Sequence, residues 1–365
     1  MAGRLPIVCD SDAPVGDGDP IDPIPLAARG TAGYPGWLAD RHGRRLRYLR
    51  LSVTDRCDLR CVYCMPEDGV PASAKEDVLS FEEIVRLLRV FRGLGVETVR
   101  FTGGEPLVRR NLPELIRMVR DEVGIQDLAL TTNGTALAPL AKALVQAGLQ
   151  RINVSLDTVD PQLFARMTRG GELSKVIAGI DAIQSAGVAE IKLNAVVVRG
   201  QNDEGAAELV EWAWARGLVP RFIELMPLGE AANLGRDAVV SVAELKQRLA
   251  PLLLDEPPLH RSDRGPAGYV AARHHPGRVV GFIGAVTDNF CHRCNRVRIT
   301  ARGDLRACLA SPTGASLRDL MRTQQSDDAL GAVVEEALYG KREGHEFYVP
   351  GVDRHHAVDM SRIGG

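Results

Sequence analysis

From about Arg47 onward, short apolar runs alternate with segments in which apolar residues recur every three or four positions. The short runs are rich in Val, Ile and Leu and have the length of β-strands. The segments between them have the spacing of helices that bury one face. Strands that alternate with helices predict parallel βαβ units with right-handed crossovers. We expect six strands, at about residues 48–53, 96–101, 127–131, 151–155, 190–198 and 220–225.

The clearest predicted helix covers about residues 80–92. Ser80 precedes it and Glu83 lies three residues later, which is the pattern of a capping box. Further helices are expected at about 242–249 and, as the last of the chain, at about 327–337. Three sets of apolar residues have the spacing of one helix face. They are Ile84, Leu87, Leu88 and Phe91; Leu112, Leu115, Ile116 and Val119; and Leu137, Leu140, Ala141 and Leu144.

The number of units limits the possible fold. Six βα units are fewer than the eight of a closed (β/α)8 barrel, so the sequence predicts an α/β protein with a partial (βα)6 barrel of the TIM type. In such barrels the chemistry lies at the carboxyl ends of the strands. Polar or glycine-rich groups follow the predicted strands at Thr102-Gly-Gly-Glu-Pro106, Thr131-Thr-Asn-Gly134, Ser155-Leu-Asp157 and Glu224-Leu-Met-Pro227, and Lys192 and Asn194 lie within the fifth strand.

Composition and charge exclude several classes of protein. The chain has 365 residues, 45% hydrophobic and 25% charged, as soluble globular proteins do. A net charge of −2 does not favour a general nucleic-acid or membrane surface. No apolar run approaches the roughly 18 residues of a membrane span, and the first 45 residues lack the apolar core of a secretory signal. We therefore expect a cytoplasmic protein, with a flexible Pro- and Gly-rich extension over residues 1–44.

The first cysteine set follows the first predicted strand. Cys57, Cys61 and Cys64 have the spacing C-x3-C-x2-C, and no fourth cysteine lies nearby. Full ligation of a [4Fe–4S] cluster needs four cysteines, so three leave one iron open to a small molecule. A zinc site or a set of buried thiols is the alternative, although the nearest histidines, His42 and His260, are far away in the sequence for a fourth ligand. Cys9 stands alone, and we expect no role for it.

A second cysteine set lies near the carboxyl terminus. Cys291, Cys294 and Cys308 again supply three ligands, which favours a second cluster with an open iron. Zinc, with His292 as a fourth ligand, remains an alternative. Arginines surround this set at positions 293, 296, 298, 302 and 306. They could form a solvated basic face. Alternatively, Arg296 and Arg298 lie on one face of a strand, and with Arg50 and Arg100 they would form a pocket for a small polyanion.

The aromatic residue before Cys64 and the spacing of the first set resemble the radical S-adenosylmethionine (SAM) enzymes. Within that superfamily, residues from about 45 to 365 are similar to the GTP 3′,8-cyclase family of molybdenum-cofactor biosynthesis. The resemblance is carried by residues 51–57, 101–106, 130–134, 151–157 and 221–226, by Arg296-Val-Arg298 and by the terminal Gly364-Gly365. It implies a barrel over residues 45–228 and a C-terminal region over residues 229–365, which carries the second cluster and a Gly-Gly tail that reaches the active site.

The resemblance also implies roles for individual residues. Cys57, Cys61 and Cys64 would hold the [4Fe–4S] cluster that cleaves SAM, and Cys291, Cys294 and Cys308 a second cluster that binds the guanine of GTP. SAM would contact Tyr63, Gly104, Ser155 and Met226. GTP would contact Arg50, Arg100, Thr131, Lys192, Arg296, Val297 and Arg298. The residues expected to be catalytic are Arg296, Arg298 and the three cysteines of the first set.

The implied reaction converts GTP to (8S)-3′,8-cyclo-7,8-dihydroguanosine 5′-triphosphate. The implied partners are a downstream cyclic pyranopterin monophosphate synthase, an unidentified electron donor and a second copy of the chain in a homodimer, with no nucleic acid and no membrane. The nearest alternative is a radical SAM enzyme that modifies a peptide with an auxiliary cluster. Such enzymes usually carry more C-terminal cysteines than the three of this chain. A non-catalytic iron–sulfur or zinc protein would not need polar groups at every strand end.

Overall fold

The computed structural model describes residues 37–260, 265–310, 314–345, 347 and 360–363. Its strands form a single sheet in the order β11-β10-β1-β2-β3-β4-β5-β6-β9-β8-β7. The strands are β1 (Tyr48–Ser52), β2 (Thr98–Thr102), β3 (Asp127–Thr132), β4 (Arg151–Ser155), β5 (Glu190–Val197), β6 (Val219–Glu224), β7 (Leu259–His260), β8 (Gly268–Ala271), β9 (Val279–Ile283), β10 (Arg296–Ile299) and β11 (Leu305–Arg306).

All six predicted strands are present, each within two residues of its expected ends, and they pair in parallel in sequence order. The C-terminal region extends this sheet at both edges, because β10 pairs in parallel with β1 and β9 with β6. β7, β8 and β11 are antiparallel additions. Within the described residues, β7 and β11 end the sheet without pairing to each other, so the barrel is partial, as predicted.

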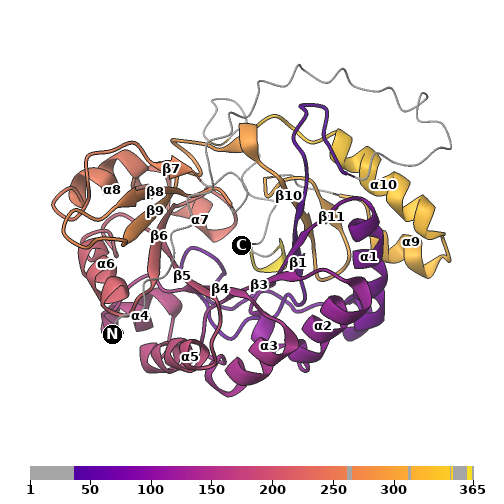
Figure 1. Cartoon of the computed structure of the whole chain (residues 1–365), viewed down its shortest axis with the longest axis horizontal. Helices are drawn as coiled ribbons and strands as arrows, with labels where there is room; N and C mark the ends of the chain where they lie inside the picture. The colour runs from indigo at the N-terminus through magenta and orange to yellow at the C-terminus, as the bar shows by residue number, and fades with distance from the viewer. Residues whose placement is uncertain (1–36, 261–264, 311–313, 346, 348–359, 364–365) are drawn as a thin grey trace.

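Helices cover the outer face of the curved sheet (Figure 1). They are α1 (Phe81–Gly93), α2 (Leu112–Met118), α3 (Ala141–Ala147), α4 (Pro161–Thr168), α5 (Leu173–Ser185), α6 (Ala206–Ala215), α7 (Glu230–Asn233), α8 (Val242–Arg248), α9 (Leu317–Arg322), α10 (Asp327–Tyr339) and α11 (Met360–Ile363). The capping box at Ser80 and Glu83 is formed. α2 continues as a π-helical turn over Val119–Val123, and α3 follows a 3-10 turn at Ala138–Leu140. None of the described helices is long and apolar enough to cross a membrane.

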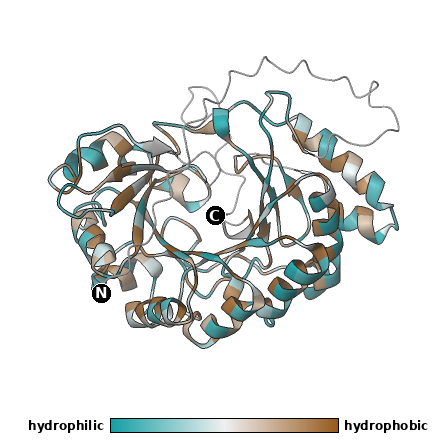
Figure 2. Cartoon of the chain, in the orientation of Figure 1, coloured by the Kyte–Doolittle hydropathy of each residue, from teal (hydrophilic) through white to brown (hydrophobic). Residues whose placement is uncertain are grey.

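The alternation of side chains along the strands divides the core from the cavity. Leu49 and Leu51 of β1 lie in the hydrophobic core under the helices, whereas Tyr48 and Arg50 line a cavity on the other side. Figure 2 shows the matching pattern on the helices, whose hydrophobic residues face the sheet. The inner side of the barrel is therefore polar, which leaves it available for ligands.

Two expectations about the ends of the chain need correction. Packing begins before residue 45, because Leu38 and Arg44 are buried, so the predicted flexible extension of residues 1–44 is too long. The helix at Asp327–Tyr339 is not the last, since α11 follows it. Apolar side chains of α11 pack with Met226 and Leu228 after β6. Cys9 and the Gly364-Gly365 tail lie outside the described residues.

Candidate functional site

The first cysteine set lies in the loop that follows β1, and this loop is fixed to the neighbouring strand ends. The amide of Gly104 donates to Thr54 O (2.9 Å), and that of Glu105 to Arg56 O (2.8 Å). A Cβ at position 104 would lie 2.4 Å from Arg56 O, so only glycine allows this approach. On the other side, Asp58 accepts hydrogen bonds from Asn133 and Thr135 after β3.

Cys57, Cys61 and Cys64 line a cavity at the carboxyl ends of the strands. The four predicted SAM contacts, Tyr63, Gly104, Ser155 and Met226, all line this cavity. The structure thus brings together residues from four separate strand ends. Burial raises the pKa of the Cys57 thiol to about 11, so a bound metal would have to displace its proton.

Two buried carboxylic acids support the wall of this cavity. Glu105 accepts hydrogen bonds from the Thr132 hydroxyl (2.7 Å) and the amides of Leu107 and Asn133, and burial raises its pKa to about 7. Asp157 accepts from the Tyr63 hydroxyl (2.7 Å) and from the amide of Val196. Burial raises the pKa of Asp157 to about 6. The Tyr63 side chain is therefore held in place by β4 and β5.

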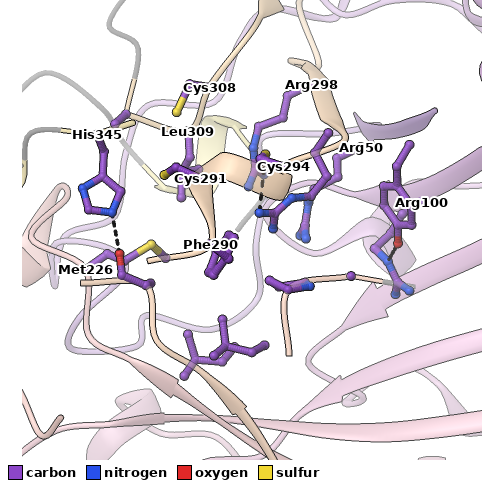
Figure 3. A pocket seen from close by; sticks show the side chains of 18 of the residues that line it. Arg50, Arg100, Met226, Phe290, Cys291, Cys294, Arg298, Cys308, Leu309 and His345 are labelled. Carbon is purple, nitrogen blue, oxygen red and sulfur yellow. Dashed lines mark hydrogen bonds between the residues drawn. The ribbon is translucent and has the colours of Figure 1, made fainter. Parts of the chain in front are cut away.

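The second cysteine set opens into another cavity. Figure 3 shows Cys291, Cys294 and Cys308 next to one another, with Arg298, Arg50 and Arg100 along the adjoining wall. These three arginines come from adjacent strands and are paired in register, Arg298 with Arg50 and Arg50 with Arg100. The predicted anion pocket is therefore a row of guanidinium groups across β10, β1 and β2.

The charges in this cavity influence one another. Burial and the neighbouring Arg296 lower the pKa of Arg298 to about 10. Burial alone would raise the pKa of the Cys294 thiol, but Arg296 and Lys341 lower it to about 6. Arg296 also lies over the ring of Phe290, with its guanidinium carbon 4.6 Å from the ring centre. An excess of buried positive charge favours an anionic ligand.

Three of the predicted substrate contacts do not line the cavity of the second cysteine set. Thr131 lines the first cavity and accepts a hydrogen bond from Arg100 (3.3 Å). Lys192 is buried and forms an ion pair with Glu190 (2.9 Å). Its strand neighbour Asn153 lines the second cavity, so Lys192 faces the same side of the sheet. The side chain of Val297 is buried in the core on the opposite side, which leaves only its backbone for a ligand.

The sequence analysis missed several residues that line the second cavity. Tyr48 accepts a hydrogen bond from Arg100, and Arg221 donates twice to the Asn194 side-chain oxygen (2.9 and 2.6 Å). Strand alternation could have identified them, because Tyr48 lies two residues before Arg50 and Arg221 two before Ile223. No comparable signal marks Lys341 and His345, which come from the segment after α10.

The two cavities are adjacent. Asn194, Ile223 and Met226 line both of them, so ligands bound at the two cysteine sets would meet at these three residues. Within the described residues, no three Cys, His, Asp or Glu side chains converge on a single ion. The cysteines of a four-iron cluster each bind a different iron, so they need not converge. His292 is exposed and lines another hollow with Arg45, Arg47 and Cys294.

Two family models match the chain. The model described as radical SAM superfamily matches residues 51–213, and the one described as Molybdenum Cofactor Synthesis C matches residues 219–347. Radical SAM enzymes use a [4Fe–4S] cluster and S-adenosylmethionine, which fits the first cysteine set.

Curated relatives cover nearly the whole chain. A GTP 3′,8-cyclase of Nitrobacter hamburgensis is 44% identical over 89% of this chain and 94% of its own length. The GTP 3′,8-cyclase of Rhizobium etli is 43% identical over 92% of this chain and 96% of its own. Among solved structures, SuiB of Streptococcus suis bound to its precursor peptide SuiA has a TM-score of 0.54 at 17% identity, over 82% of this chain and 67% of SuiB. That likeness shows the radical SAM fold alone. By sequence, the chain belongs to the GTP 3′,8-cyclase family of the radical SAM superfamily.

Proposed function

We propose that this chain is a GTP 3′,8-cyclase, which converts GTP to (8S)-3′,8-cyclo-7,8-dihydroguanosine 5′-triphosphate in molybdenum-cofactor biosynthesis. One observation carries the proposal beyond family membership. Each three-cysteine set opens into its own cavity, and the two cavities meet at Asn194, Ile223 and Met226. An enzyme that brings a radical source to a separately bound substrate needs this arrangement, because the reacting atoms must be held in near contact.

In the first cavity, Cys57, Cys61 and Cys64 would hold a [4Fe–4S] cluster with one open iron. When bound there and reduced by one electron, the cluster would cleave SAM to methionine and supply a 5′-deoxyadenosyl radical for removal of the ribose 3′ hydrogen. Tyr63, Gly104, Ser155 and Met226 would bind SAM. Glu105 and Asp157 would hold the surrounding loops through the hydrogen bonds described above.

In the second cavity, Cys291, Cys294 and Cys308 would hold a second cluster, and its open iron would bind guanine. The row of Arg298, Arg50 and Arg100 would bind the triphosphate, because guanidinium groups bind phosphate oxygens with paired hydrogen bonds. Arg296 and Lys192, the backbone of Val297 and the hydroxyl of Thr131 would add further contacts. The chain would thereby fix guanine C8 and the ribose 3′ carbon at the junction and exclude water.

The product would pass to a cyclic pyranopterin monophosphate synthase, and an electron donor would reduce the first site. A homodimer, a cytoplasmic location and the division at residue 229 stay predictions. The likeness to the peptide-binding SuiB concerns the fold alone, so it does not favour the peptide-modifying alternative.

The test is anaerobic reconstitution with iron and sulfide, followed by incubation with dithionite, SAM and single nucleotides. We expect about eight irons per chain. GTP, and not ATP or CTP, should yield the cyclised nucleotide together with 5′-deoxyadenosine. Stoichiometric zinc with little iron, or 5′-deoxyadenosine formation that is independent of GTP and gives no cyclised nucleotide, would contradict the proposal.

A further inference from the structure

Two buried cations from distant parts of the chain bind the backbone beside the second cysteine set. Arg44 donates to the carbonyl of Cys291 itself (2.6 Å). Lys341 donates to the carbonyl of Arg296, two residues after Cys294 (2.6 Å), and to that of Ala307, directly before Cys308. Each of the three cysteines therefore has a neighbouring carbonyl that is bound by Arg44 or Lys341.

The two cations are joined through the segment of residues 341–345. Arg44 also donates to the carbonyls of Arg342 and Glu343 (2.7 Å for Glu343), and its Nε forms an ion pair with Asp40 (2.6 Å). A Cβ on Gly344 would lie 3.8 Å from the Cβ of Cys291, which shows how closely this segment packs on the cysteine loop. The imidazole of His345 is bonded to Ala285 O (2.6 Å) at the start of the same loop.

Lys341 differs from Arg44 in its counter-charge. Arg44 has the Asp40 carboxylate, and both side chains are almost fully buried. Lys341 is 3% exposed and is bonded to neutral carbonyls, which compensate an ammonium group only in part. Burial lowers the pKa of Lys341, and Arg296 and Arg44 lower it further, whereas Cys294 and Cys308 raise it. Negative charge at the second cysteine set, next to these carbonyls, would therefore compensate Lys341.

We propose that Arg44 and Lys341 are positioning residues of the second metal centre, and that Lys341 also supplies the buried positive charge that balances the negative charge of the centre. This inference rests on the proposed function, since it assumes a cluster at Cys291, Cys294 and Cys308. It makes the segment around Asp40 and Arg44, far from the cysteines in sequence, a part of that centre. The first site lies outside this set of contacts and serves as an internal reference.

The main test compares Lys341→Met, Lys341→Arg and the control Lys142→Met, which changes an exposed lysine of α3. After reconstitution, wild type and Lys142→Met should hold about eight irons per chain and Lys341→Met about four. Lys341→Met should keep SAM cleavage at the first site. Lys341→Arg, which preserves the charge, should restore most of the lost iron. If Lys341→Met retains both clusters, a more negative reduction potential of the second cluster would still support the charge role.

The inference is overturned if Lys341→Met holds about eight irons with an unchanged potential at the second cluster. A wild-type protein with only about four irons would instead contradict the proposed function. Should Lys341→Met fail to fold, Arg44→Lys provides the second test. It keeps the charge beside Asp40 but loses the planar fork that reaches three carbonyls. Hydrogen exchange of the metal-free chain should then be faster in residues 285–296 and unchanged in residues 54–65. Equal protection of residues 285–296 in variant and wild type would overturn the inference.

Discussion

At the scale of single residues, the cations buried on the inner side of the sheet are costly to the fold. Lys192 illustrates this cost, because burial first, and then the charge of Arg221, lowers its pKa from 10.5 to about 8. Its ion pair with Glu190 offsets only part of the effect. Burial of a cation reduces the stability of the folded chain. An anion that binds nearby removes this penalty, so the same free energy contributes to the affinity for the anion.

This cost predicts a pH dependence of stability. The unfolded chain binds more protons than the folded chain between about pH 8 and 10.5, so Lys192 makes the free energy of unfolding rise with pH in that window. The full amplitude is about 3 kcal/mol. We expect Lys192→Met to be more stable than wild type at pH 7 and to lack this rise. Denaturant unfolding of the metal-free proteins from pH 7 to 10 measures it.

The difference between wild type and variant removes the contributions of cysteines and tyrosines, which also titrate in this range. Lys142→Met, which changes an exposed lysine, should follow the wild-type curve. Parallel curves for wild type and Lys192→Met would show that Lys192 is not a buried cation in solution.

The arginine row could be predicted from sequence because the charged positions alternate along strands that were themselves predictable. The alternation that identified Arg296 and Arg298 applies equally to Tyr48 and Arg221. Tyr48 lies outside the motifs, and Arg221 lies in the segment 221–226 but was assigned no role there. Arg44 and Lys341 could not be found in this way. They bind backbone carbonyls, and such contacts depend on tertiary packing rather than on any local spacing.

At the scale of elements, the first cysteine loop depends on contact between two backbones. Gly104 follows β2 and lies against Arg56, directly before Cys57. An added methyl group would lie 2.7 Å from the Arg56 carbonyl carbon, which is backbone and cannot rotate away.

We predict that Gly104→Ala displaces the loop and reduces the iron of the first site by more than half, with loss of SAM binding. The second site should keep its iron, so the total falls from about eight toward about four per chain. Gly93→Ala at the end of α1 is the matched control, because nothing lies within 4 Å of the added Cβ. Iron analysis and titration with SAM distinguish the variants. Full iron content and unchanged SAM affinity in Gly104→Ala would mean that the loop tolerates the shift.

The same scale shows why the sheet was only partly predicted. The six central strands follow from repeated alternation with amphipathic helices, which is a strong signal. β9 and β10 come from the C-terminal region, in which strands and helices do not alternate regularly. They are added at opposite edges of the six central strands. The alternation of Arg296 and Arg298 did indicate a strand, but sequence could not show that its partner is β1. Edge pairing between segments more than 240 residues apart is decided by the fold as a whole.

At the scale of the whole molecule, the segments added at the two edges of the sheet carry the cysteines of the second site, while the loop after β1 carries those of the first. β10 and the loop after β9 bring the second cysteine set over the barrel, and α11 packs beside Met226. The cavities consequently meet at one wall. Chemistry between their ligands then depends on the size of the side chains in that wall.

We predict that Ile223→Phe separates cofactor cleavage from cyclisation. Ile223 is partly buried and lines both cavities, so a phenyl ring there would hold the two ligands further apart. A displacement of about 1 Å can cost up to about 100-fold in rate, so we expect the cyclised nucleotide formed per 5′-deoxyadenosine to fall at least about tenfold. Iron content and the separate affinities for SAM and GTP should change little, because neither cysteine set nor the arginine row is touched. The ratio is measured by quantifying both products from one anaerobic reaction. An unchanged ratio would mean that cofactor and substrate meet somewhere other than at Asn194, Ile223 and Met226.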